Sequence, residues 1–195
     1  IPADFSTATF PLTAAAVTGG TVDIRNLDFN DRQGDKAVFD YFAGMGISID
    51  RRADFTRVNS SARFHGMELD LNSTPDALPA LAVAGALAQG RTALVNVPQA
   101  RIKETDRIAC MTRELNKMGA TITELPDGMI IEGGKLHGAE VDGCGDHRIV
   151  MALTIAGLAA DGETIVSTAE AAAVTYPDFV HDFRKIGADI TIIED

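Results

Sequence analysis

Apolar side chains recur at helical spacing ahead of several glycines in this chain. Ile108, Met111, Leu115 and Met118 lie three or four residues apart, which places them on one face of an α-helix that ends at Gly119. After this glycine, apolar and polar residues alternate, which predicts a β-strand. The same succession of helix, glycine and strand is predicted around two further glycines, Gly46 and Gly187.

Runs with the composition of β-strands alternate with Ala-rich and amphipathic helices along the chain. Three of these runs lie at residues 92–97, 128–131 and 163–167, and their β-branched residues favour strands. Together with the helices they give a βαβαββ-like order of elements that is used three times. Because helices and sheets pack against each other in layers, we expect an α/β (α+β) fold.

Two landmarks indicate that this pattern is an internal repeat. A Gly-x-Thr turn places Thr21, Thr92 and Thr164 at separations of 71 and 72 residues, and the glycines at the helix ends are 73 and then 68 residues apart. We therefore divide the chain into repeats of about 1–60, 61–134 and 135–195. Each repeat alone would leave its apolar helix uncovered, which predicts that all three share one core in a single domain spanning residues 1–195.

Composition narrows the classes of protein to which this chain can belong. Its 195 residues are 46% hydrophobic and 23% charged, as in a globular protein that buries a core. The net charge of -11 would repel nucleic acid and anionic membranes, so neither is an expected partner. The longest apolar run, residues 77–88, contains Pro79 and Gly85 and is too short to cross a bilayer.

The two cysteines bear on the expected location and chemistry of the protein, and the first residue bears on whether the chain is a piece of a longer one. Only Cys110 and Cys144 are present, so no disulfide framework is expected, which favours a cytoplasmic location. Cys110 lies among apolar residues and is interpreted as part of the core. Cys144 with His147 is weak evidence for a thiol nucleophile and too small a set for a metal site, so we expect no metal. The chain begins at Ile1 rather than Met, which suggests a piece of a longer protein.

Side chains of very different kinds occupy equivalent positions at three predicted helix starts. Counting back 16 positions from each turn threonine gives Phe5, Asp76 and Arg148. Packing in a hydrophobic core would not require three side chains as different as these. Asp76 follows a hydroxyl cap and a proline in residues 72–75 and, in a first turn, would offset the helix dipole. Alternatively it is a general base or accepts a hydrogen bond from a ligand hydroxyl. Its position alone leaves both interpretations open.

The third helix start favours a functional interpretation. His147 and Arg148 in a first turn work against the helix dipole, because the free backbone N–H groups already make that end positive. The arrangement becomes favourable when an anion binds there. Gly143 and Gly145 would let the backbone approach such a ligand closely.

Residues 101–107, with the sequence Arg-Ile-Lys-Glu-Thr-Asp-Arg, pack three cations and two acids into seven positions. Lys103, Glu104 and Arg107 are spaced so that their side chains can meet near a helix start. A solvated charged face is the simpler explanation for such a run. Arginine, however, suits carboxylate and phosphate groups. The segment therefore predicts part of an enzyme site for a small phosphorylated or carboxylated substrate.

Three motifs in this sequence are specific to one family. They are Arg-Ile-Lys-Glu-Thr-Asp-Arg-Ile at 101–108, Gly-Asp-His-Arg-Ile-Val-Met-Ala at 145–152 and Thr-Tyr-Pro-Asp-Phe at 175–179; weaker matches are Gln-Gly-Asp at 33–35 and Pro-Asp-Ala at 75–77. With them the chain resembles the 5-enolpyruvylshikimate-3-phosphate synthase family over nearly its whole length. Members of that family are about twice as long, with two domains of three βαβαββ units each in an inside-out α/β barrel. The resemblance implies that this chain is one such domain, the C-terminal half, and that an N-terminal domain of the same protein is its partner.

The resemblance also implies a reaction and residue roles. The enolpyruvyl group of phosphoenolpyruvate is transferred to the 5-hydroxyl of shikimate 3-phosphate in the shikimate pathway, phosphate is released, and no cofactor is needed. Asp76 would take the hydroxyl proton, with Lys103 beside it and Glu104 transferring a proton at the methylene carbon. The remaining substrate contacts implied are Gln99 to shikimate 3-phosphate, and Arg107, Arg148 and the supporting His147 to phosphoenolpyruvate.

One position departs from the family pattern. Where the family usually has a lysine that meets phosphoenolpyruvate, this chain has Val174, and a valine cannot replace a cation. Two alternatives therefore stand beside the synthase: a relative of UDP-N-acetylglucosamine enolpyruvyl transferase, which the motifs at 101–108 and 145–152 argue against, and a ligand-binding module without catalysis. Because half of the site would lie in the other domain, we expect residues 1–195 alone to be inactive.

Overall fold

The computed structural model describes residues 3–193, which contain six α-helices and nine β-strands. Residues 1–2, which begin the first predicted repeat, and residues 194–195, which end the third, lie outside the described residues. The helices are α1 (Phe5–Thr18), α2 (Ala37–Gly44), α3 (Leu78–Leu87), α4 (Arg107–Lys117), α5 (His147–Ala159) and α6 (Phe179–Lys185). The strands are β1 (Thr21–Arg25), β2 (Ser48–Arg51), β3 (Phe55–Asn59), β4 (Glu68–Asp70), β5 (Arg91–Val95), β6 (Thr121–Leu125), β7 (Gly128–Glu132), β8 (Glu140–Asp142) and β9 (Ile165–Ser167).

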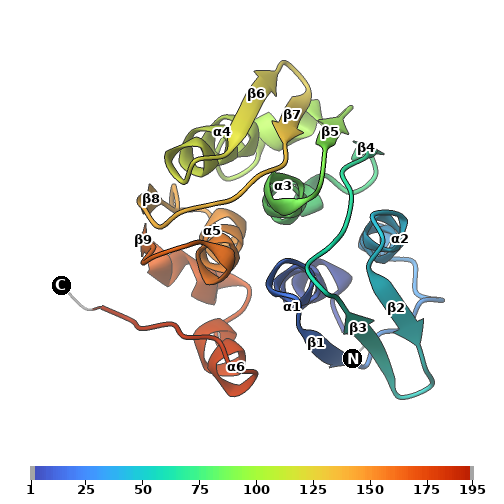
Figure 1. Ribbon diagram of the computed structural model, residues 1–195. Coiled ribbons are helices and arrows are strands. Elements are labelled where there is room, and N and C mark those ends of the chain that lie inside the picture. Colours follow the sequence, from blue (N-terminus) through green and yellow to red (C-terminus); the bar gives the residue numbers. More distant parts are fainter. Residues whose placement is uncertain (1–2, 194–195) are drawn as a thin grey trace.

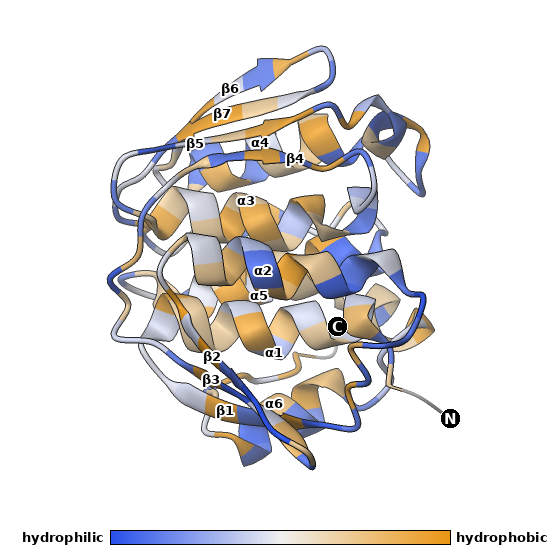
Figure 2. Ribbon diagram, turned by 90° about the vertical axis from the view of Figure 1, so that its right-hand side faces the viewer, coloured by the Kyte–Doolittle hydropathy of each residue, from blue (hydrophilic) through white to orange (hydrophobic). Residues whose placement is uncertain are grey.

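Three helices form the centre of the molecule. In Figure 1, α1, α3 and α5 are seen nearly end-on and contact one another, with the sheets around them. The hydrophobic colour of α3 in Figure 2 agrees with the burial of every residue from 78 to 86. A helix that is apolar on all sides needs neighbours on all sides, and α3 finds them in α1, α5, α4 and its own sheet.

The outer helix α4 is amphipathic, as its spacing predicts. Ile108, Met111, Leu115 and Met118 are fully buried, and Cys110 is 6% exposed, which confirms both predictions for this helix. The glycines that end the three outer helices have φ angles of 101°, 89° and 104° at Gly46, Gly119 and Gly187. A residue with a side chain rarely adopts such angles, so glycine is the residue that lets the chain leave these helices.

The strands form three separate sheets. β1, β3 and β2 form an antiparallel sheet in the order β1-β3-β2; β4, β5, β7 and β6 form a mixed sheet in the order β4-β5-β7-β6; and β8 and β9 form a parallel pair. Only the middle repeat shows the full βαβαββ order within residues 3–193. The division at about 60 and 134 stays a prediction.

The prediction of a strand after Gly187 is wrong. β2 and β6, which follow the other two glycines, each pair with the strand that comes next along the chain. Residues 188–193 form no strand, and within the described residues no strand follows to pair with them. An alternating pattern predicts a strand conformation, but a strand also requires a neighbour to bond its backbone.

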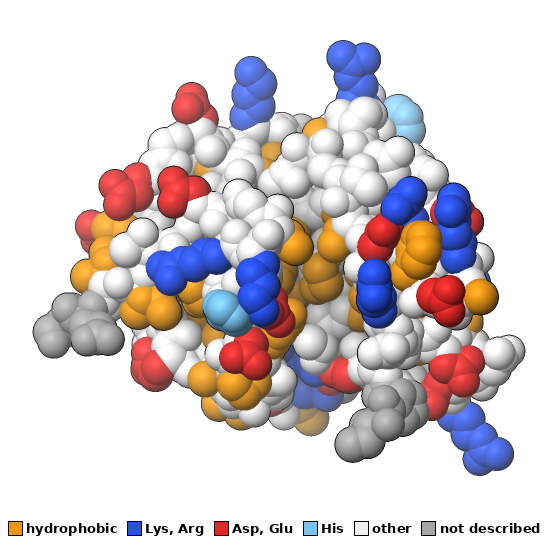
Figure 3. Space-filling model, turned by 90° about the horizontal axis from the view of Figure 1, so that it is seen from below, with side chains coloured by type: hydrophobic (Ala, Val, Ile, Leu, Met, Phe, Trp, Pro, Cys, Tyr) orange, Lys and Arg blue, Asp and Glu red, His pale blue; other side chains and the backbone are white. Residues whose placement is uncertain are grey.

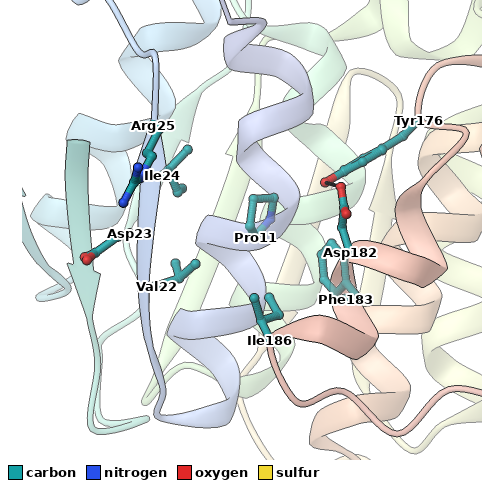
Figure 4. A pocket seen from close by; sticks show the side chains of 9 residues that line it. All are labelled: Pro11, Val22, Asp23, Ile24, Arg25, Tyr176, Asp182, Phe183 and Ile186. Atoms are coloured by element: carbon teal, nitrogen blue, oxygen red, sulfur yellow. Dashed lines mark hydrogen bonds between the residues drawn. The ribbon is translucent and has the colours of Figure 1, made fainter. Parts of the chain in front are cut away.

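A shallow depression of about 220 Å³ lies between β1 and α6, lined mainly by Pro11, Val22, Ile24, Phe183 and Ile186. Figure 4 shows these side chains from close by, and Figure 3 shows hydrophobic side chains in a hollow of this face between charged groups. None of the predicted site residues lines it. Among residues 3–193, no helix combines the length and the apolar character needed to span a membrane.

Candidate active site at three converging helix starts

The site is built where the starts of three helices meet. Asp76 lies in the short 3-10 helix η2 (Pro75–Ala77) that leads into α3, Arg107 is the first residue of α4, and Arg148 lies in the first turn of α5. Arg107 Nη1 is 2.8 Å from Asp76 Oδ1, and Arg148 Nη2 is 3.4 Å from Asp76 Oδ2. Lys103 Nζ is 3.2 Å from Asp76 Oδ1. One partly exposed carboxylate therefore faces three cations.

Arg107 lies beneath this surface, with only 1% of its side chain exposed. Its Nε donates to Asp146 Oδ2 at 2.8 Å, and its Nη2 is 2.6 Å from Glu104 Oε2. A buried guanidinium is tolerated only when its charge is paired and its N–H groups are bonded, and Asp146 is itself fully buried. The simpler explanation for residues 101–107, a solvated charged face, therefore does not hold for Arg107.

Asp146 is a member of the site that sequence analysis missed. It is the N-cap of α5 and accepts the backbone N–H of Arg148 at 2.8 Å, a position at which aspartate is preferred. The N-cap preference was readable from the sequence. Its bond to Arg107, 39 residues away, was not.

Lys103 and Glu104 lie on the turn between the 3-10 helix η3 (Pro98–Ile102) and α4. Their side chains are 32% and 49% exposed, so both are accessible to a ligand. His147 is buried, with Nδ1 3.8 Å from Glu104 Oε1. Burial lowers the pKa of His147, Arg148 lowers it further, and Asp146 and Glu104 oppose the change without reversing it. The imidazole is therefore neutral at pH 7.

The carboxylates of the site differ in acidity. Burial would raise the pKa of Asp76, but Arg148, Lys103 and Arg107 outweigh it, so the pKa lies below its ordinary value. Asp35, in the 3-10 helix η1 (Gly34–Lys36), has a raised pKa because it is partly buried and near the charge of Asp76. The first repeat thus adds an acidic group to the surroundings of Asp76.

Other predicted residues lie nearby or have other roles. Gln99 donates to the backbone oxygen of Asn72 at 2.9 Å, which ties η3 to the segment just before η2. The predicted hydroxyl cap before Asp76 is wrong: the Thr74 side chain makes no capping bond. Phe5, equivalent in position to Asp76 and Arg148, packs edge-on in an aromatic cluster.

Two further side chains bear on the chemistry. Burial and the neighbouring thiol of Cys110 raise the pKa of Cys144 to about 12, which makes it a poor thiol nucleophile. Val174 ends the 3-10 helix η4 (Ala169–Val174) and is 76% exposed. Its apolar side chain offers no charge to a ligand.

Comparison with solved structures defines the class of protein. The chain resembles the 2.37 Å structure of EPSP synthase from Acinetobacter baumannii, with a TM-score of 0.86 and 29% identity over the whole chain and 48% of that protein. A second EPSP synthase structure from the same organism gives a TM-score of 0.84 at 28% identity. The fold is therefore that of an enolpyruvyl transferase-like α/β domain, which confirms the predicted fold class.

Comparison of sequences defines the family. The family model described as EPSP synthase (3-phosphoshikimate 1-carboxyvinyltransferase) matches residues 1–183. A 3-phosphoshikimate 1-carboxyvinyltransferase of Ruminiclostridium cellulolyticum is 54% identical over 99% of this chain, and one of Methanocella arvoryzae is 48% identical over 98%. The chain belongs to the EPSP synthase family. It spans about half the length of these relatives, 46% in both cases.

Proposed function

We propose that this chain is the C-terminal domain of a 3-phosphoshikimate 1-carboxyvinyltransferase, which moves the enolpyruvyl group of phosphoenolpyruvate to the 5-hydroxyl of shikimate 3-phosphate and releases phosphate. The observation that carries the proposal is one carboxylate, Asp76, held among Lys103, Arg107 and Arg148 in a chain of this family. Three cations around one acid suit substrates that bring several negative charges. The other domain would supply the remaining ligands, and the reaction would take place in the cytoplasm.

The arginines would bind the carboxylate of phosphoenolpyruvate. Arg148 is only weakly engaged, at 3.4 Å from Asp76, and it lies in the first turn of α5, where free N–H groups also favour an anion. Arg107 Nε stays hydrogen-bonded to Asp146, which fixes the orientation of the guanidinium from its buried side. A substrate carboxylate can reach Arg107 by displacing Glu104 or Asp76 from Nη2 or Nη1.

This displacement gives Asp76 a role as general base. Its lowered pKa comes from the cations around it. When substrate carboxylate and phosphate groups take over those cations, the charge that holds the proton affinity of Asp76 down is neutralised, so its pKa rises. The carboxylate then becomes basic enough to accept the proton of the 5-hydroxyl only in the loaded site.

The remaining residues would orient the acceptor and move the second proton. Lys103 shares Asp76 Oδ1 with Arg107 and would contact shikimate 3-phosphate. Gln99, bonded to Asn72 just before η2, would contact the same substrate. Glu104, freed from Arg107, would transfer a proton at the methylene carbon. His147, neutral and adjacent to Arg148, would support the phosphoenolpyruvate site without adding charge.

The test is phosphate release by the full-length protein from phosphoenolpyruvate with shikimate 3-phosphate. We expect Asp76→Asn to lower kcat at least about 100-fold, the range of general base catalysis. Asp70→Asn is the matched control, because Asp70 is a nearby carboxylate held by Asn96 and outside the site. Residues 1–195 alone should show no turnover. Phosphate release with UDP-N-acetylglucosamine as the only acceptor would instead assign the protein to the sibling transferase.

A second candidate, a ligand-binding module without catalysis, is favoured by Val174. In the full-length protein, Val174→Lys should lower the KM for phosphoenolpyruvate if the site is catalytic, because it adds a cation where the family usually has one. Ala173→Lys places the same charge on the preceding exposed residue as a control. If the wild-type protein and Val174→Lys both bind shikimate 3-phosphate in calorimetry but release no phosphate, the module is the correct description.

A further inference from the structure

Arg101 is a charged residue of the motif at 101–107 to which the proposed function assigns no role. Its Nε donates to the backbone oxygen of Pro126 at 2.7 Å, and its Nη2 donates to that of Leu125 at 2.5 Å. The same Nη2 is 2.8 Å from Glu124 Oε1, and Nη1 is 2.7 Å from Asp106 Oδ2. All three nitrogens of the guanidinium are therefore bonded, in a side chain that is only 24% exposed.

These bonds join two parts of the middle repeat. Residues 124–126 are the end of β6 and the first residue of its turn to β7. Asp106 is the N-cap of α4, and its Oδ1 accepts the N–H of Ala109 at 3.0 Å. A second link, Val97 N–H to Asp127 oxygen at 2.8 Å, ties the start of η3 to the same turn. Arg101 therefore anchors the chain between η3 and α4 to the β6–β7 turn at its start, and its bond to Asp106 holds the end of that chain to the same guanidinium.

The anchored stretch carries the reactive side chains. Lys103 and Glu104 lie between the two anchors, on exposed backbone with no regular hydrogen bonding of its own. Their side chains nevertheless meet Asp76 at 3.2 Å and Arg107 at 2.6 Å. A turn can hold two side chains at such distances only if its ends are fixed, because its own backbone bonds do not fix it.

We propose that Arg101 is a positioning residue, which holds the 102–106 turn against the β6–β7 hairpin so that Lys103 and Glu104 stand at Asp76 and Arg107. The proposal rests on the proposed function for its kinetic consequences. Lysine cannot take the place of Arg101, because a single ammonium cannot bond two backbone oxygens and two carboxylates in the directions of a planar fork.

The kinetic test compares Arg101→Lys and Arg101→Gln with wild type in the full-length protein. Misplacing catalytic groups by about 1 Å can cost on the order of 100-fold, and we expect kcat to fall between about 10-fold and 100-fold. The KM for phosphoenolpyruvate should stay within about threefold, because Asp146 and Asp76 hold Arg107 and Arg148. Arg57→Gln is the control: it removes another bidentate arginine, bonded to Asp23 at 2.7 Å, far from the site in sequence.

A second measurement needs no substrate. Endoproteinase Lys-C cleaves after Lys103, and the anchored turn should resist it; both Arg101 variants should be cleaved there at least about tenfold faster, as expected when local opening becomes easier. Cleavage after Lys135, outside the contacts of Arg101, should not change. If a variant fails to fold, Glu124→Gln removes one partner of Arg101 and should give a smaller change in the same direction.

Wild-type kcat in both Arg101 variants would overturn the proposal, and so would unchanged cleavage after Lys103. A fall in kcat that the Arg57→Gln control shares equally would also overturn it, because the effect would then be one of general stability. If the wild-type protein releases no phosphate, the proposed function fails, and the Lys-C measurement alone decides whether Arg101 positions the turn.

Discussion

The buried pair of Arg107 and Asp146 allows a quantitative test of how the site is held together. The substitution Arg107→Met removes the guanidinium but keeps an apolar side chain of similar length. It leaves the Asp146 carboxylate, which is 0% exposed, without its cation. Breaking a buried pair from one side costs about 3–5 kcal/mol of unfolding free energy, whereas an exposed pair such as Arg57 with Asp23 is screened by solvent and contributes little.

Urea unfolding of the chain, followed by circular dichroism, measures this cost. With an m value of about 2 kcal/mol/M, a loss of about 4 kcal/mol moves the midpoint down by roughly 2 M. The matched variant Arg57→Met should move it by less than about 0.5 M.

A double variant separates the charge from the packing. In Arg107→Met with Asp146→Asn, the side chain at 146 is neutral and can still cap α5. We expect the double variant to recover about 1–3 kcal/mol relative to Arg107→Met alone, the cost of an unsatisfied buried group. A loss below about 1 kcal/mol in Arg107→Met, or a double variant no more stable than the single one, would refute the reasoning.

Three further predictions follow from single groups. Burial would raise the pKa of Glu114, but the hydrogen bond from Lys117 and other donors outweigh burial, so the pKa lies below its ordinary value. The ionised Glu114 therefore stabilises the fold above pH 4.5, and this stabilisation is lost as pH falls through the lowered pKa. Glu114→Gln should therefore lower Tm at pH 7, by a margin that narrows below pH 4.5, and a constant margin would contradict this. Asp76→Asn removes the negative charge that helps to raise the pKa of Asp35, so the pKa of Asp35, followed by NMR titration of its carboxyl carbon, should fall towards its ordinary value; an unchanged or higher pKa would disprove the coupling. Gly119→Ala forces a side chain into a φ of 89° and should cost about 1–3 kcal/mol in denaturant unfolding; an unchanged midpoint would show that the backbone relaxes there.

Local structure in this chain is largely determined by the sequence. The spacing of Ile108, Met111, Leu115 and Met118 predicts a helix and its buried face, and all four side chains are fully buried. The glycines that end the outer helices are likewise required by a backbone angle that other residues avoid. Such features depend on residues that are near one another along the chain, so a sequence pattern is enough to find them.

The strand expected at 188–193 shows where a local pattern is not enough. The alternation of residues there is similar to that in β2 and β6, but those strands exist because β3 and β7 bond to them. Strand formation depends on backbone hydrogen bonds to a neighbouring segment. The pattern describes one partner only, so it predicts the preference and not the pairing.

The site itself was decided by the tertiary structure. The sequence determined which residues stand at the three helix starts and, through the family motifs, which of them belong together. It did not determine that Arg107 is buried, or that Asp146 holds it from below, because the two residues are 39 positions apart. Whether a charged residue is solvated or paired in the interior depends on which elements pack around it, and only the packing of α3, α4 and α5 decides that.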